Sequence, residues 1–305
     1  QLSIDPAQEW QQMFADAWRM HRDFLFDKGM RGLDWNASKA KYQPLLQRVT
    51  DRYELDDVFA QMMGELNALH SQVRGGEYRT DSTASRAASL GAEFDRDKAG
   101  LVIRHIYRTD TDLPLLAAPL ARPGVNANEG DTLIAVNGIA VKDVPSLTQA
   151  LRNQVGKQVL LTLKRDKKQW QTVAEPVSTA QDNQLRYQDW VAANQQMVAD
   201  ASDSQFGYLH LYAMGSNDIA SFAREFYANF DKPGLIIDVR RNRGGNIDSW
   251  IIEKLLRRAW AFWQPTQGGA YTNMQQAFRG HLVVLSDQLT YSDGETFSAG
   301  VKALG

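Results

Sequence analysis

The sequence contains no cysteine among its 305 residues, which excludes disulfide bonds, thiolate metal ligands and a cysteine nucleophile. It also carries little net charge, because 34 lysines and arginines face 36 aspartates and glutamates. A chain with a formal net charge of -2 has no general attraction to phosphate backbones or anionic lipid, so we expect neither a nucleic-acid partner nor a membrane partner. No apolar run approaches the roughly 18 residues of a transmembrane helix.

Histidine is also scarce, with 5 in the chain. No two of them have the four-residue spacing of a helical zinc site, so a zinc hydrolase is disfavoured and we expect no metal and no other cofactor. Four are predicted to be packed or surface residues: His21, His105, His210 and His281. His70 differs because it ends a predicted helix and precedes a glycine-containing loop, so it can emerge toward another domain. A capping or packing role for His70 is the alternative.

The periodicity of apolar residues divides the chain into regions. Between residues 5 and 69 they recur every three or four positions, which predicts about three helices, the third beginning at Asp51 with Glu54 as its capping-box partner. The predicted organisation is a helical segment at 1–76, a linker at 77–89, a β module at 90–178 and an α/β domain at 179–305. The fold class is therefore α/β multidomain.

Short β-rich runs in the module predict strands at 101–106, 132–136, 159–164 and 170–173, with a turn at Asn137-Gly138 and one helix at 144–153. After a polar stretch at 179–184, strands and helices alternate. The predicted strands are 207–212, 234–239 and 282–286, and the predicted helices are 216–230, 246–262 and 293–304. Such alternation requires crossover connections and indicates a largely parallel sheet.

Ligands bind beyond the carboxyl ends of strands in such sheets, which directs attention to two turns. The first, at 240–246, contains Gly244 and Gly245 before a helix, so its backbone N–H groups can approach developing negative charge in an oxyanion hole or a phosphate cradle. It lacks the lysine of a Walker motif and the spacing of a dinucleotide fingerprint. The alternative is a glycine turn with solvated arginines at Arg240, Arg241 and Arg243.

The second turn, at 286–295, brings Ser292 to the start of a predicted helix. Ser292 and Glu295 have the spacing of a capping box, so helix capping is one interpretation. In the other, the exposed Ser292 hydroxyl is a nucleophile and the N–H of Asp293 stabilises an oxyanion. A serine nucleophile needs a base, and His70 is the candidate.

These residues, taken together, resemble the tricorn core protease family, relatives of the carboxyl-terminal processing proteases. The resemblance covers almost the whole chain. It is carried by GELNALH at 64–70, a PDZ-like stretch at 119–138, DVR at 238–240 followed by the paired glycines, and SDGE at 292–295. It implies a PDZ-like module and a crotonase/ClpP-like serine peptidase domain. Ser292 would be the nucleophile, His70 the general base, and the N–H groups of Asp293 and of Gly244 or Gly245 the oxyanion hole.

The resemblance also implies peptide substrates, a homo-oligomer and a cytoplasmic location, or a periplasmic one if a signal peptide precedes Gln1. The chain departs from the family at Leu69, where a serine commonly links the histidine to a distant glutamate, and that glutamate would lie beyond Gly305. We therefore expect a truncated α/β domain. A non-catalytic peptide-binding protein on the same scaffold is the alternative function, and the PDZ-like module is either a peptide-binding module that adds a strand or a spacer. A nucleotide-dependent enzyme using the glycine turn is a remote third.

Overall fold

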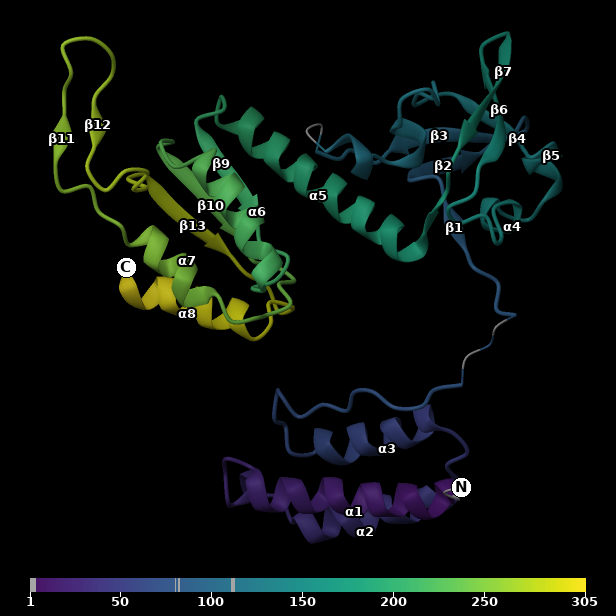
Figure 1. Cartoon of the computed structure of the whole chain (residues 1–305), viewed down its shortest axis with the longest axis vertical. Coiled ribbons are helices and arrows are strands. Elements are labelled where there is room, and N and C mark those ends of the chain that lie inside the picture. Colours follow the sequence, from purple (N-terminus) through teal and green to yellow (C-terminus); the bar gives the residue numbers. More distant parts are fainter. Residues whose placement is uncertain (1–3, 80, 82, 111–112) are drawn as a thin grey trace. The chain divides into compact units, whose positions relative to one another are not determined.

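The computed structural model describes residues 4–79, 81, 83–110 and 113–305. The chain forms two compact units, residues 1–84 and residues 85–305 (Figure 1). In the described ranges, no helix combines the length and the apolar character needed to cross a membrane. The same ranges contain no group of three His, Cys, Asp or Glu side chains that could hold a metal ion.

The first unit is helical, as predicted. Its helices are α1 (Pro6–Phe24), α2 (Trp35–Tyr42) and α3 (Arg52–Gly64), with short 3-10 helices η1 (Met30–Gly32) and η2 (Gln43–Arg48). Each α-helix starts after an aspartate whose carboxylate accepts backbone N–H groups of the first turn, including the predicted start at Asp51. The buried faces meet in one apolar core that includes Phe14, Leu55 and Met62.

The second unit begins with the predicted β module. Its strands are β1 (Ala88–Ser89), β2 (Ala92–Arg96), β3 (Leu101–Ile106), β4 (Thr132–Val136), β5 (Ile139–Ala140), β6 (Val159–Arg165), β7 (Lys168–Ala174) and β8 (Val177–Ser178), with the short 3-10 helices η3 (Pro114–Leu116), η4 (Pro119–Ala121) and η5 (Val141–Asp143). An antiparallel sheet has the order β2-β3-β4-β6-β7, and β5 pairs with β4. Asn137 and Gly138 connect β4 to β5 with φ values of 50° and 81°, the left-handed backbone that the predicted turn requires.

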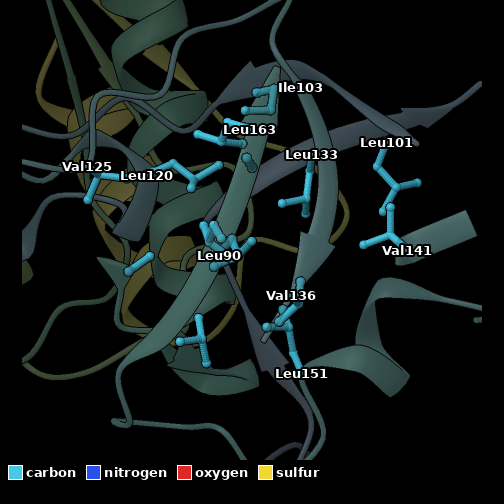
Figure 2. Packing of buried hydrophobic residues seen from close by; sticks show 14 of the residues in the cluster. Leu90, Leu101, Ile103, Leu120, Val125, Leu133, Val136, Val141, Leu151 and Leu163 are labelled. Atoms are coloured by element: carbon cyan, nitrogen blue, oxygen red, sulfur yellow. The ribbon is translucent and has the colours of Figure 1, made fainter. Parts of the chain in front are cut away.

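Leucine, isoleucine and valine side chains from this sheet and its connections fill one core (Figure 2). Leu133 and Leu163 are completely buried, and the alternation of inward and outward residues along their strands fixes the register. The predicted helix at 144–153 is shorter in the structure, where α4 spans Leu147–Ala150. Its N-cap is Ser146, and Pro145 lies before the helix.

The α/β region follows. Its elements are α5 (Thr179–Ala201), β9 (Phe206–His210), α6 (Ser216–Tyr227), β10 (Gly234–Asp238), α7 (Asp248–Leu255), β11 (Phe262–Trp263), β12 (Tyr271–Thr272), β13 (His281–Leu285) and α8 (Asp293–Leu304). The three main strands have the order β13-β10-β9 and are all parallel, which confirms the predicted parallel sheet. The carboxyl ends of β9, β10 and β13 therefore share one edge.

One helix of this region was not predicted, and another is shorter than predicted. The polar stretch at 179–184 is the first part of α5, a 23-residue helix that starts with a capping box between Ser178 and Gln181 and packs along β9 (Figure 1). The helix predicted at 246–262 ends at Leu255, because the following residues lead into the hairpin of β11 and β12. That hairpin extends away from the three-stranded sheet (Figure 1).

Candidate active site

Three loops meet at the carboxyl edge of the parallel sheet. The loop after β10 lies in the middle and is held on both sides by main-chain hydrogen bonds. On one side the N–H of Arg243 donates to the carbonyl of Tyr212 (3.0 Å) and the N–H of Met214 donates to that of Gly244 (2.8 Å). On the other side the N–H of Tyr291 donates to the carbonyl of Asn242 (2.9 Å). The two turns singled out in the sequence therefore contact each other at this edge of the sheet.

Ser292 occupies the position before α8 in a backbone conformation that few non-glycine residues adopt. Its φ and ψ are 53° and -116°. Conformations of this kind cost on the order of 1–3 kcal/mol and persist where surrounding contacts impose them, often at functional sites. Here the carboxylate of Glu295 accepts the backbone N–H of Ser292 (2.9 Å), which is the glutamate half of the predicted capping box.

Gly244 lies directly against the Ser292 side chain. A Cβ on Gly244 would come 2.6 Å from Ser292 Cβ and 3.2 Å from its Oγ, and the φ of Gly244 is +75°. At Gly245 a Cβ would come 1.8 Å from the carbonyl oxygen of Met214. Both positions require glycine, because a side chain would push the loop away from Ser292 or from Met214 in the loop after β9.

The structure distinguishes between the two glycines as oxyanion donors. The N–H of Gly244 already donates to Oδ1 of Asn242 (2.8 Å). No described residue accepts a hydrogen bond from the N–H of Gly245 or from that of Asp293. Asp293 is also the first residue of α8, where the helix dipole favours negative charge. Gly245 and Asp293 are therefore the better pair of donors.

Asn242 is a structural residue of this site that the sequence did not reveal. It is completely buried, and besides accepting the Gly244 N–H it donates from Nδ2 to the carbonyl of Leu211 (2.7 Å). Its side chain thus ties the glycine turn to the loop after β9. No sequence signal distinguishes it, because it stands between two arginines in a segment that reads as solvated.

The loop after β13 is braced from two further directions. Thr290 Oγ1 donates to the carbonyl of Val239 (2.9 Å), and the Asp293 carboxylate accepts the N–H groups of Ile247 (2.7 Å) and Asp248 (3.0 Å). The Asp293 side chain therefore caps the start of α7 while its own N–H stays without an acceptor in the described chain. The starts of α7 and α8 are fixed to each other by these bonds.

His70 follows α3 in the first unit and is exposed. It lines an apolar cavity of about 850 Å³ together with Met20, Leu25 and Leu69. His70 belongs to residues 1–84 and Ser292 to residues 85–305, and the pairing of their side chains stays a prediction.

The chain on both sides of His70 is anchored. Before it, the Glu65 carboxylate accepts hydrogen bonds from Lys41 (2.5 Å), Ser38 (2.5 Å) and Tyr42 (2.8 Å). These bonds lower the pKa of Glu65 to about 2, and the bond from Lys41 has the largest effect. After it, Ser71 Oγ lies 2.5 Å from Nε2 of His21. The segment that carries His70 is thus held to α1 and α2.

Comparison with known proteins agrees with this organisation. Residues 6–64 match the Tricorn protease C1 domain, residues 88–179 the Tricorn protease PDZ domain, and residues 205–305 Peptidase family S41. Tricorn protease homolog 1 of Streptomyces coelicolor is 34% identical over 307 residues, which cover 99% of this chain and 28% of that protein. The chain belongs to the tricorn protease family.

Other members of the tricorn protease family agree. A putative Tricorn-like protease C-terminal subunit of Sulfurisphaera tokodaii is 34% identical, covering 97% of this chain and 34% of that protein. The crystal structure of the tricorn protease superimposes with a TM-score of 0.90 at 25% identity, over 100% of this chain and 29% of that one. The chain thus spans about a third or less of the length of these relatives. The predicted fold class and family are confirmed.

Of the three arginines of the glycine turn, Arg240 departs from the solvated-surface alternative. Arg240 forms a two-pronged ion pair with Asp238, whose carboxylate is completely buried and also accepts the Tyr208 hydroxyl (2.8 Å). Burial alone would raise the pKa of Asp238, but the hydrogen bonds from Arg240 outweigh it and lower the pKa. Arg240 is thus a fixed part of the loop, whereas Arg241 and Arg243 are exposed.

Proposed function

We propose that this chain forms the catalytic part of a serine peptidase that hydrolyses oligopeptides or unfolded polypeptides through an acyl-enzyme. The observation that carries the proposal is Ser292. Its strained backbone is pressed against Gly244, beside two N–H donors, Gly245 and Asp293, that have no acceptor among the described residues. Such donors stabilise the oxyanion of a tetrahedral intermediate, which is commonly the largest contribution to acyl-transfer catalysis.

In the proposed reaction His70 removes the proton of the Ser292 hydroxyl while Oγ attacks the scissile carbonyl carbon. The oxyanion is held by the N–H groups of Gly245 and Asp293. The C–N bond then breaks, and the leaving amine takes the proton from His70. Water, deprotonated by His70, hydrolyses the acyl-enzyme, releasing a carboxylate product and restoring Ser292.

The substrate and assembly predictions remain part of this proposal. Peptides are the proposed substrates, and a homo-oligomer is the proposed assembly. The compartment stays a prediction, cytoplasmic unless a signal peptide precedes Gln1.

The test is mass spectrometry after treatment of the full-length protein with a fluorophosphonate probe. We expect the probe on Ser292, and we expect Ser292→Ala and His70→Ala to lose it. Ser286→Ala and His281→Ala are matched controls, because both residues are exposed at the ends of β13. They should keep the label on Ser292.

An unlabelled Ser292 in the otherwise unchanged protein would overturn the proposal and favour the non-catalytic peptide-binding alternative. If Ser292 is still labelled in His70→Ala, the assignment of Ser292 as the nucleophile stands and the assignment of His70 as its base is wrong. The two assignments are thus tested separately.

A further inference from the structure

A cavity of about 540 Å³ lies at the same carboxyl edge as Ser292 and has no role in the chemistry above. Its walls come from α5, from the end of β9 and from the loops after β9, β10 and β13. The residues are arginines and aromatic side chains with one histidine and one aspartate: Arg186, Tyr187, Trp190, His210, Tyr212, Arg240, Arg241, Arg243 and Asp287. A volume in this range suits one or two amino-acid side chains of a ligand.

The charges of the cavity leave one positive charge in excess. Two of its four arginines are paired, Arg240 with Asp238 and Arg186 with Asp182 (2.9 Å). Glu93, a second carboxylate near Arg186, also pairs with Arg104 outside the cavity.

Arg241 and Arg243, by contrast, have no acidic partner in the part of the chain that the structure describes. The one acid facing them is Asp287, whose carboxylate accepts the N–H groups of Arg241 (3.0 Å) and Leu289 (3.0 Å). These bonds, with the Arg241 N–H as the largest influence, lower the pKa of Asp287, so it is ionised. Two free guanidinium groups against one carboxylate match a single monovalent anion.

The aromatic side chains hold the guanidinium groups in place. Arg243 lies over the ring of Tyr212, 4.8 Å from its centroid, and Arg240 lies over Trp190 at 5.4 Å. Stacking of this kind fixes the plane of a guanidinium while leaving its N–H groups available, and the planar fork matches a carboxylate in two parallel hydrogen bonds.

The back wall is fixed by His210. Its Nε2 lies 2.9 Å from the carbonyl of Arg240, which can only accept, so Nε2 carries the proton. Nδ1 must then accept the hydroxyl hydrogen of Tyr187 (2.8 Å). These bonds join α5, β9 and the arginine loop, and burial lowers the pKa of His210, so the wall stays neutral near pH 7.

We propose that this cavity binds a carboxylate of the peptide substrate, supplied either by an acidic side chain or by the C-terminus. The inference rests on the proposed peptidase function, because it places the ligand's charged group beside the same loop that approaches Ser292. Arg243 directly precedes Gly244, which packs against Ser292. The test peptides carry the carboxylate at the third residue beyond the scissile bond, which corresponds to about 10 Å of extended chain at 3.3–3.6 Å per residue.

The test measures binding of labelled hexapeptides to full-length protein carrying Ser292→Ala, by fluorescence anisotropy. Four peptides of one sequence are used: with Glu or with Gln at the third position beyond the scissile bond, each as the free acid or as the C-terminal amide. We expect carboxylate-bearing peptides to bind at least about tenfold more tightly than the neutral one, an advantage that shrinks as salt is added. Whether Glu or the free terminus gives the gain identifies the source.

The readout for the arginine is the ratio of affinities for the charged and neutral peptides within one variant, which general damage to the fold does not change. We expect Arg243→Gln to bring this ratio close to one and Arg152→Gln, an exposed arginine of the β module, to leave it unchanged. Equal binding of all four peptides, or an unchanged ratio in Arg243→Gln, would overturn the proposal.

Hydrolysis of the same peptides by the protein with Ser292 intact separates the two proposals. Arginine-dependent binding without cleavage would retain the carboxylate site and overturn the peptidase function. Cleavage of all four peptides at one rate, with no effect of Arg243→Gln on the ratio of affinities for charged and neutral peptides, would support the peptidase function and overturn the carboxylate site.

Discussion

Replacing Asn242 by alanine should destabilise the second unit and disorganise the glycine turn. The Asn242 side chain is completely buried and makes two hydrogen bonds, at 2.7 Å to the Leu211 carbonyl and at 2.8 Å from the Gly244 N–H. Truncation strands one buried acceptor and one buried donor, and each costs about 1–3 kcal/mol. The free energy of unfolding should therefore fall by about 2–6 kcal/mol.

The assay is urea unfolding followed by circular dichroism, combined with the rate at which a fluorophosphonate labels Ser292. Asn246→Ala is the matched control, since this exposed asparagine lies four residues along the same loop. Surface substitutions of this kind change stability by about 0.5 kcal/mol or less. If Asn242→Ala unfolds at the same urea concentration as Asn246→Ala and labels at the unchanged rate, the side chain does not hold the turn.

Asn242→Asp tests the same side chain through the pH dependence of stability. Aspartate keeps an acceptor for the Gly244 N–H but offers no donor to the Leu211 carbonyl, and it buries a negative charge there. Burial disfavours the ionised form, so the loss of stability should be larger at pH 7 than at pH 4, where the carboxyl group can take up a proton and donate. A loss that is the same at both pH values would contradict this account.

Three further predictions concern the supports of the site. Glu65→Gln should destabilise the first unit at pH 7, because the pKa of Glu65 in the folded state is about 2 and lies below its ordinary value of 4.5. The destabilisation should disappear as the pH falls from 4.5 toward about 2. Thermal unfolding at pH 7 and pH 3 checks this, with the exposed Glu77→Gln as control. The pKa of His210 is lowered by burial, so its contribution to stability is present above about pH 6.5 and declines below it; His210→Gln should flatten the dependence between pH 5 and 6.5, and an unchanged slope would argue against the buried neutral ring. Gly245→Ala should abolish labelling of Ser292, because its Cβ would come 1.8 Å from Met214 O, whereas Gly269→Ala meets nothing within 4 Å and should label normally.

Much of the secondary structure follows from hydrophobic periodicity. The strands β3 and β4 and the helix α8 have the predicted bounds, because each buries one regular set of apolar positions. Helix α5 was missed for the opposite reason. Of its 23 residues, Leu185 is the one apolar residue that is buried, and the polar surface of the helix resembles a linker.

The short hairpin of β11 and β12 has no sequence pattern that predicts it. Strands β11 and β12 have two residues each and expose Phe262, Trp263 and Tyr271, so no alternation marks them. In the site, glycine spacing and a serine at a helix start predict Ser292, Asp293 and either Gly244 or Gly245 as the residues to examine. These sequence features do not show which glycine N–H already has an acceptor, because the acceptor of the Gly244 N–H is the side chain of Asn242 in the same turn.

The coupling between the two turns explains why their sequences belong together. The absence of a Cβ at Gly244 makes room for the Ser292 side chain, and the left-handed backbone of Ser292 brings that side chain toward Gly244. Tyr291 and Asn242 close the same contact through the main chain. The contact between Ser292 and Gly244 is therefore held by backbone hydrogen bonds and close packing, which salt affects little. Anion binding in the neighbouring arginine cavity would instead depend on exposed charge, which salt screens. The proposed catalytic geometry and the proposed preference for a substrate carboxylate thus rest on different physical interactions, so each can change without the other.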